Sequence, residues 1–170
     1  DVDYWTIIYL HEGEQFQFAP QADWGGDFGG QATVNDVAGA NITVDGTNLV
    51  AGKAGWYLLY IHNGSERTFT VLEPNVYLIG DTAGEWNVAD SHKFTVPTTE
   101  DGVFESPAFA NDAELRMCVS IDNFDWWKTE FIIFDGNIAY RGRGGDQDRV
   151  AVKAGQKAYL NFAKGTGEIK

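Results

Sequence analysis

Cysteine is almost absent from this chain, which has a single thiol, Cys118, among its 170 residues. One thiol excludes an intramolecular disulfide framework and any metal site built from several cysteines. Long apolar runs are also missing, because no stretch approaches the roughly 18 consecutive apolar residues of a membrane-spanning helix. No signal peptide opens the chain, and its start at Asp-Val-Asp without a methionine suggests a processed or trimmed product.

Positive charge is scarce as well. Twelve lysines and arginines stand against 25 aspartates and glutamates, which gives a formal net charge of −13. Nucleic acids and anionic membrane surfaces are bound through basic patches, so this balance argues against both as partners. The negative charge is compatible with a neutral or cationic partner, or it serves only to keep the protein soluble.

The motifs of catalysis and metal binding are missing too. The three histidines are scattered: His11 and His62 flank turns, and His92 lies two residues after Asp90. We find no His-x-His, His-Glu-x-x-His, Gly-x-Ser-x-Gly or phosphate-loop motif, and no EF-hand spacing of acidic residues. The acidic residues fall mainly in turns and on outward strand positions, where they are solvated. The sequence therefore predicts a protein that is not an enzyme and needs no metal or cofactor.

Helical periodicity is weak, and strand patterns fill the chain instead. Asp-Gly, Asn-Gly and Gly-Gly dipeptides at turn positions separate the apolar segments, as in an all-β fold. We predict an all-β protein of the β-sandwich type. The predicted strands are Tyr4–Leu10, Gln15–Phe18, Asn41–Val44, Gly55–Ile61, Thr68–Leu72, Val76–Ile79, Val103–Phe104, Leu115–Ile121, Phe131–Phe134, Ile138–Arg141, Val150–Val152 and Ala158–Phe162.

An internal repeat divides the chain. Val50-Ala51 with Lys53-Ala54-Gly55 recurs one hundred residues later as Val150-Ala151 with Lys153-Ala154-Gly155. Gln15–Phe18 and Asp23-Trp24 have counterparts in the second half in the same order. A period of this length is about one sandwich domain. We predict two tandem β-sandwich domains, a partial module over residues 1–73 and a complete module over residues 74–170.

The first module is shorter than the second. It has no counterpart of residues 76–96, a segment with two strands and Trp86. Two explanations remain open: the chain is a fragment whose upstream part is absent, or the first module is a reduced sandwich. We favour the fragment, because a missing strand would leave an unpaired edge.

Aromatic residues are abundant, at 14% of the chain, and their placement suggests a binding surface. In residues 112–128, the alternation of Leu115, Met117, Val119 and Ile121 predicts a strand whose outward face carries Arg116. Two adjacent tryptophans and Lys128 follow. An exposed indole can stack on the apolar face of a sugar ring, while arginine, lysine or amide side chains bind the hydroxyl groups.

The six tryptophans are predicted to have different roles. Trp5 and Trp56 lie in apolar strands and are predicted to be structural, whereas Trp86 lies in a polar, glycine-containing loop and is predicted to be exposed. Strand alternation predicts that one of the adjacent pair Trp126-Trp127 faces outward and the other inward. We predict that Trp126 is the platform and Trp127 the core anchor.

The ordered run of segments in the second module resembles the carbohydrate-binding domains of the SusE/SusF family, starch-binding outer-membrane lipoproteins. The segments are VYLIGDTAGEWN, DGVF, ELRM, DWWKTEF, IAYRG with GGDQ, and VKAGQKAYLNF. The resemblance covers the second module nearly from end to end, and the first from its second quarter onward.

The resemblance implies non-catalytic β-sandwich modules on the cell surface, lipid-anchored in the full-length protein, that hold starch-like α-1,4-glucan or another oligosaccharide near an outer-membrane glycan-transport complex. In this family a loop tryptophan, a strand cation and a second aromatic form an arc, and Trp86, Arg116 and Trp126 match these positions. Lys128 and Arg141 are additional candidates from local geometry. In the first module Gln17 stands where a cation is expected, so that Trp24 and Gln17 predict at most a weak second site.

Two other hypotheses remain open from the sequence. The chain could comprise accessory domains of a surface glycosidase, or it could be a structural spacer in a cell-surface array.

Overall fold

The structure is built almost entirely of strands. In a computed structural model that describes residues 2–170, the chain divides between Pro74 and Asn75 into two compact units. Helical structure among the described residues is limited to two short 3₁₀ helices, η1 (Asp90–His92) and η2 (Trp126–Thr129). The prediction of an all-β fold is therefore confirmed.

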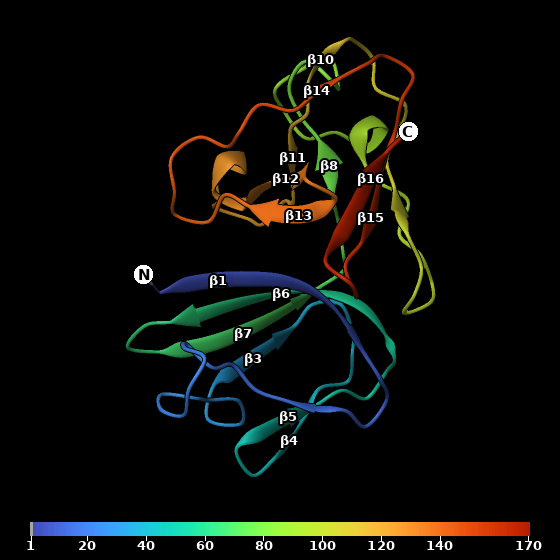
Figure 1. Ribbon diagram of the computed structural model, residues 1–170. Helices are drawn as coiled ribbons and strands as arrows, with labels where there is room; N and C mark the ends of the chain where they lie inside the picture. The colour runs from blue at the N-terminus through green and yellow to red at the C-terminus, as the bar shows by residue number, and fades with distance from the viewer. Residues whose placement is uncertain (1) are drawn as a thin grey trace. The chain divides into compact units, whose positions relative to one another are not determined.

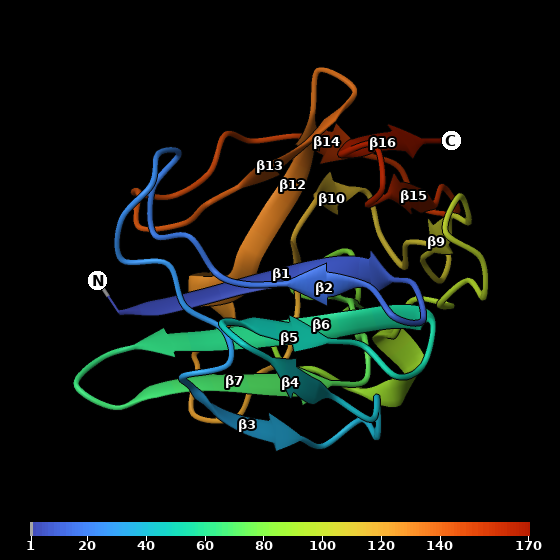
Figure 2. The same cartoon turned by 90° about the horizontal axis from the view of Figure 1, so that it is seen from below.

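Unit 1, residues 1–74, is a sandwich of two sheets. One sheet has the strand order β1-β6-β7-β3 and the other has the order β2-β5-β4. Figure 2 shows the smaller sheet lying over the larger one, and Figure 1 shows the same two layers edge-on. The strands are β1 (Asp3–Leu10), β2 (Gln15–Phe16), β3 (Thr33–Asp36), β4 (Thr43–Asp45), β5 (Asn48–Val50), β6 (Gly55–Asn63) and β7 (Arg67–Leu72).

Apolar side chains from both sheets fill the space between the two layers of unit 1. Leu49 of the small sheet and Phe69 of the large sheet are both buried in this core. Phe28, from the loop before β3, is fully buried, and its ring contacts that of Phe69 edge to face at 5.5 Å. Burial of these large side chains is the main force that holds the two sheets together.

Unit 2, residues 75–170, has a sheet in the order β8-β11-β12-β13-β16-β15-β9 and a separate pair, β10-β14. Its interior strand β12 is buried from Glu130 to Ile133, which places apolar side chains on both of its faces. The strands are β8 (Tyr77–Leu78), β9 (Phe104–Glu105), β10 (Ala113–Glu114), β11 (Met117–Cys118), β12 (Glu130–Phe134), β13 (Asn137–Tyr140), β14 (Ala151–Val152), β15 (Ala158–Asn161) and β16 (Thr166–Ile169).

The repeat detected in the sequence corresponds to a repeated strand pairing. In unit 1, Gln15 of β2 pairs with Val50 of β5. In unit 2, Glu114 of β10 pairs with Ala151 of β14, and the amide of Leu115 donates to the carbonyl of Val150. The same sequence segments therefore form the same antiparallel contact in each unit.

Several strands differ from the sequence-based expectation. β3, β5, β10 and β16 were not predicted, since each has only two to four residues and few of the β-branched or aromatic residues that mark a strand. The predicted strand Leu115–Ile121 shortens to β11, with Met117 paired to Leu78 on one side and to Phe131 on the other. The apolar alternation marks burial here, because Leu115, Val119 and Ile121 are all buried outside the ladder.

Cys118 lies buried in this sheet, and burial raises the pKa of its thiol to about 12. The thiol is therefore a packing group. No helix of the described residues is long and apolar enough to cross a membrane.

The β12–β13 hairpin provides a test of the turn that the Asp-Gly dipeptide predicted. Asp135 and Gly136 both have positive φ, 52° and 77°, between the paired residues Phe134 and Asn137. Nothing lies within 4 Å of a Cβ added at Gly136, so Gly136→Ala affects only the backbone. We expect it to lower the free energy of unfolding, measured by urea denaturation, by about 1 kcal/mol.

Gly145→Ala is the matched control, since a Cβ added at Gly145 also meets nothing within 4 Å and its φ is not in the positive range. It should change stability by less than half as much. Equal effects of the two substitutions would contradict the backbone explanation.

Candidate functional site

A pocket of about 430 Å³ in unit 2 brings together most of the residues that the sequence singled out. Two aromatic segments and a group of charged side chains form its walls. The lining residues are Trp86, Arg116, Trp126, Trp127, Arg141 and Asp146.

Trp86 is held by the loop that follows β8. Gly80 forms a bridge with Glu85 and donates its amide to the Glu85 carbonyl at 2.7 Å, which closes the loop just before the indole. The Trp86 ring lies over Gly80, where a Cβ would stand only 3.0 Å from a ring carbon, and Gly80 has a φ of +82°. A glycine is required there on both grounds. Trp86 is 52% exposed, in agreement with the exposure predicted from its loop.

Trp126 and Trp127 lie in η2 and not in a strand. Thr129 anchors the end of this helix, because its buried hydroxyl donates to the Val119 carbonyl at 2.6 Å. Successive residues of a 3₁₀ helix are turned by about a third of a circle, so two neighbours can both face the solvent. The prediction that Trp127 is a core anchor is wrong, since its side chain is 43% exposed. Trp126 is half-buried.

The two candidate platforms meet. The ring centroids of Trp86 and Trp126 are 5.5 Å apart, and the ring planes are inclined at 48°. The contact is too close for a ligand to enter between the rings. Together they form one continuous, bent aromatic surface.

Arg116 lies elsewhere than predicted. The sequence placed it on the outward face of a strand, but it lies between β10 and β11 and is only 8% exposed. Its guanidinium donates to both carboxylate oxygens of Glu130, at 2.9 and 3.1 Å, and to Asp146 at 2.7 Å. The prediction failed because the carboxylates that bind Arg116 come from segments 14 and 30 residues away. These hydrogen bonds, foremost the one that Arg116 donates to Asp146, raise the pKa of Arg116.

Glu130 connects two arginines below the pocket. Its side chain is fully buried and accepts from Arg116 on one side and from Arg141, at 3.0 Å, on the other. A buried carboxylate is tolerated only when it is paired and hydrogen-bonded. Glu130 therefore fixes the positions of two of the predicted site residues, Arg116 and Arg141.

Asp146 is the carboxylate that reaches the pocket itself. Hydrogen bonding from Arg116 lowers the pKa of Asp146 to about 2, and Arg149 adds to the effect. Arg149 also pairs with Glu114 at 2.9 Å. Asp146 is therefore ionised at any physiological pH and can accept hydrogen bonds.

The cations also contact the tryptophans. The guanidinium carbon of Arg116 lies 5.9 Å from the ring centroid of Trp126, and that of Arg141 lies 5.5 Å from the centroid of Trp127. Lys128 is exposed, with its ammonium 5.5 Å from the Trp127 centroid, and it does not line the pocket.

The two candidates in unit 1 are both exposed. Trp24 is 84% exposed in the loop closed by the bridge between Phe18 and Phe28, and Gln17 precedes that bridge. The backbone amide of Trp24 donates to the side chain of the preceding residue, Asp23, at 2.8 Å. Neither residue lies in the pocket of unit 2.

Sequence reasoning missed three residues of this site: Trp127, Glu130 and Asp146. Glu130 had a detectable signal, because it is a charged residue at the start of a strand that is otherwise Phe-Ile-Ile-Phe. Asp146 belongs to the GGDQ segment of the family resemblance, but its polar, glycine-rich surroundings gave no sign of a role beyond that of a solvated carboxylate.

The site combines a bent aromatic surface with fixed donors and acceptors on a β-sandwich, an arrangement suited to sugar rings. No group of three or more potential metal ligands occurs among residues 2–170. These features define the class of carbohydrate-binding modules.

The comparison with known families agrees with this class. The family described as SusF/SusE starch-specific CBMs (carbohydrate-binding modules) matches two segments of the chain, residues 1–71 and 75–168. The chain belongs to this family, as the ordered motifs of the second module indicated.

A relative and a solved structure support the assignment. The chain is 49% identical over 178 aligned residues to the outer membrane protein SusF of Bacteroides thetaiotaomicron, covering 98% of this chain and 36% of the relative. It is also similar to the crystal structure of SusF from that organism, with a TM-score of 0.92 at 47% identity, over 99% of this chain and 40% of that one. The chain thus spans little more than a third of the length of this relative.

Removal of the buried carboxylate tests its structural role. Glu130→Ala leaves Arg116 and Arg141 without their shared acceptor, so we expect the free energy of unfolding in urea to fall by about 3–5 kcal/mol. Glu114→Ala is the control, because the Glu114–Arg149 pair is half-exposed and should contribute about 0–1 kcal/mol. Similar losses of unfolding free energy in Glu130→Ala and Glu114→Ala would contradict the structural role of the buried carboxylate.

The low pKa of Asp146 predicts a pH dependence. Its value of about 2 in the folded protein lies below the ordinary value of 3.8, so the unfolded chain takes up a proton first as the pH falls. The stabilisation by this ion pair is therefore complete above about pH 4 and is lost between about pH 4 and pH 2. Asp146→Asn should be less stable than the wild type at pH 6, and thermal unfolding should show this difference shrinking toward pH 2.

Asp148→Asn, at an exposed position two residues away, controls for the loss of one negative charge. A stability difference for Asp146→Asn that stayed constant from pH 6 to pH 2 would contradict the ion-pair assignment.

Proposed function

We propose that unit 2 binds starch-like α-1,4-glucan without cleaving it. The observation that carries this proposal is the contact between Trp86 and Trp126 beside Arg116, Arg141 and Asp146 in one pocket. The membership of the chain in a family of starch-specific modules supports the choice of ligand.

The bend of the aromatic surface favours a helical glucan. Consecutive glucose rings of an α-1,4-linked chain turn relative to one another, whereas those of a β-1,4-linked chain form a flat ribbon. Two indoles inclined at 48° follow the first shape better than the second. Trp127, which is exposed and lines the same pocket as Trp126, would extend the surface. Its cation contacts with Arg141 and Lys128 hold the ring in place.

Arg116, Arg141 and Asp146 would bind the sugar hydroxyls. The arginine side chains are oriented by Glu130 before any ligand arrives, so little conformational entropy is lost on binding. Asp146, whose low pKa keeps it charged, accepts from a hydroxyl donor.

The same carboxylates speak against hydrolysis. A glycosidase needs a carboxylic acid that is protonated near neutral pH, which requires a raised pKa. The pKa of Asp146 is instead lowered to about 2, and the Glu130 side chain is fully buried and cannot reach a sugar. Neither is suited to donate a proton to a glycosidic oxygen.

We further propose a place on the outer-membrane surface, close to a glycan-transport complex. The name of the relative, outer membrane protein SusF, supports the location. The transport partner rests on the family resemblance alone. We propose that each of the two units is one module, and that Trp24 and Gln17 give unit 1 at most weak binding.

The tryptophans test this proposal. Affinity electrophoresis in gels with amylopectin, xylan or mannan should show retardation of the wild type by amylopectin. Trp86→Ala or Trp126→Ala should each remove most of it, because each deletes half of the bent surface. The exposed Trp24→Ala variant is the control and should lose little.

The alternative hypotheses predict other outcomes. Unretarded migration of the wild type in every gel would favour a structural spacer. Release of reducing sugar from amylose by the chain itself would contradict binding without hydrolysis.

A further inference from the structure

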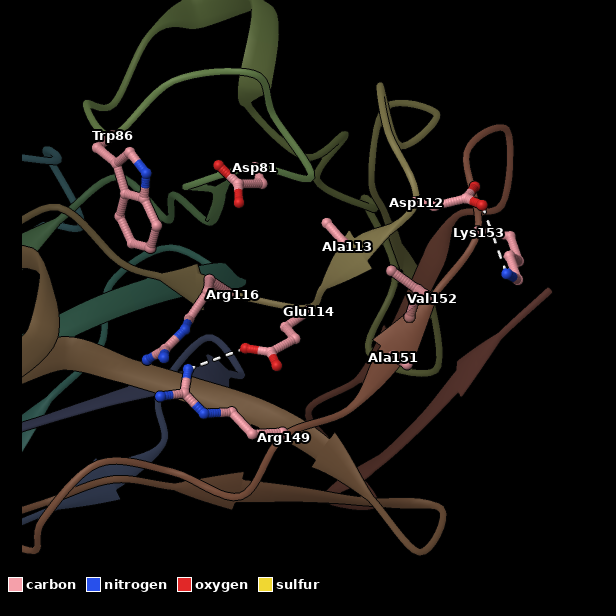
Figure 3. Close-up of a pocket in the computed structure, with 10 residues that line it drawn as sticks. All are labelled: Asp81, Trp86, Asp112, Ala113, Glu114, Arg116, Arg149, Ala151, Val152 and Lys153. Atoms are coloured by element: carbon pink, nitrogen blue, oxygen red, sulfur yellow. Dashed lines mark hydrogen bonds and ion pairs between the residues drawn. The ribbon is translucent and has the colours of Figure 1, made fainter.

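A second pocket of about 350 Å³ lies next to the first in unit 2 and contains none of the predicted residues except Trp86 and Arg116. Its floor runs along the pair β10–β14, where Ala113 faces Val152 and Glu114 faces Ala151 in the antiparallel register. Figure 3 shows Trp86 and Arg116 at one end of this strip and Lys153 at the other.

The lining is chemically similar to that of the first pocket. Ala113, Ala151 and Val152 provide an apolar strip, and one aromatic wall comes from Trp86. Carboxylates and cations both contribute to the lining. An apolar strip between donors and acceptors matches the face and the edge of a sugar ring.

Two ion pairs provide these polar groups. Glu114 pairs with Arg149 at 2.9 Å, and Asp112 pairs with Lys153 at 3.4 Å, as the dashed lines in Figure 3 mark. All four side chains are more than half exposed, so the pairs contribute little to folding. Exposed pairs still have free donor and acceptor positions for hydroxyl groups.

Asp112 is a fixed member of this set. It accepts from the Ala154 amide at 2.9 Å, and this hydrogen bond lowers the pKa of its carboxyl, with Lys153 contributing further. Arg149 is fixed by Asp146, a residue of the first pocket, at 2.8 Å. Asp112 and Arg149 are therefore held in position in the absence of a ligand.

The two pockets adjoin. Trp86 and Arg116 line both, so the aromatic surface and the β10–β14 strip share these two side chains. A glucan is a long ligand that continues beyond any single platform. A short oligosaccharide would fill only the first pocket.

We propose that the second pocket is an extension subsite that binds the glucose units following those on the Trp86–Trp126 surface. This inference rests on the proposed function. The ligand is the same neutral α-glucan, and the subsite makes unit 2 selective for long chains over short ones. Lys153, Glu114 and the Ala151 strip contact the extension.

The test compares two chain lengths by isothermal titration calorimetry. Maltotriose and maltoheptaose are titrated into the full chain carrying Trp24→Ala, which removes any contribution from that residue of unit 1. Ala151→Leu fills the strip, and Lys153→Ala removes a donor. Each should weaken maltoheptaose binding by about fivefold, equivalent to about one hydrogen bond, and change maltotriose binding by less than about twofold.

Ala163→Leu and Lys164→Ala are matched controls at exposed positions of unit 2 that do not line the pocket, and they should change neither affinity. Lys153 is too exposed for its loss to unfold the protein, which keeps the test valid if Ala151→Leu disturbs β14.

Unchanged maltoheptaose affinity in both test variants would overturn the extension subsite. The proposed function would survive that result as long as Trp86→Ala still abolished binding of both sugars. Failure of the unsubstituted site to bind either sugar would overturn both proposals.

Discussion

The buried carboxylate of Glu130 is the interaction on which the geometry of unit 2 depends. It stands at the start of the interior strand β12, has no exposed side-chain surface, and accepts from both Arg116 and Arg141. A carboxylate in such a place destabilises the fold unless its partners are exact in position, so its presence constrains them strongly. Asp146 completes the arrangement from a segment that follows β13, and bonds the second edge of the Arg116 guanidinium. Hydrogen bonds thereby join three segments that are distant in the sequence, those of Arg116, Glu130 and Asp146.

The aromatic surface is organised around this charged group. Arg116 lies against Trp126, and Arg141 lies against Trp127. Because Glu130 holds both arginines, it also helps to orient the two tryptophans of η2. Trp86 lies on the loop after β8, and the close approach of its ring to Gly80 fixes its position. Sugar recognition by stacked indoles needs rings that do not rotate when the ligand arrives, because each immobilised side chain costs binding free energy. In unit 2 the contacts with Gly80, Arg116 and Arg141 already restrict the rings in the folded protein, before a ligand binds.

Charge balance within the site suits an uncharged ligand. Hydrogen bonds of 3.3 Å or less match Arg116, Arg141 and Arg149 with Glu130, Asp146 and Glu114. The cluster as a whole is close to neutral in a chain of net charge −13, so it presents dipoles and hydrogen-bonding groups rather than a field that would attract an anion. Unit 1 has Gln17 at the position that corresponds to Arg116, which removes the cation around which such a cluster could form.

The sequence by itself determined the fold class, the repeat, the family and the exposure of Trp86, because each depends on local patterns: strand alternation, turn dipeptides, ordered motifs and a polar loop. It also identified Arg116, Arg141 and Trp126 as candidates.

Only the tertiary structure decided how these residues are used. Arg116 is buried because Glu130 and Asp146, remote in sequence, converge on it. Trp127 is exposed because it lies in η2, where a helical turn abolishes the strand-like alternation on which its burial was predicted. Ion pairing between distant segments and a local change of backbone conformation leave no mark in the periodicity of a single sequence.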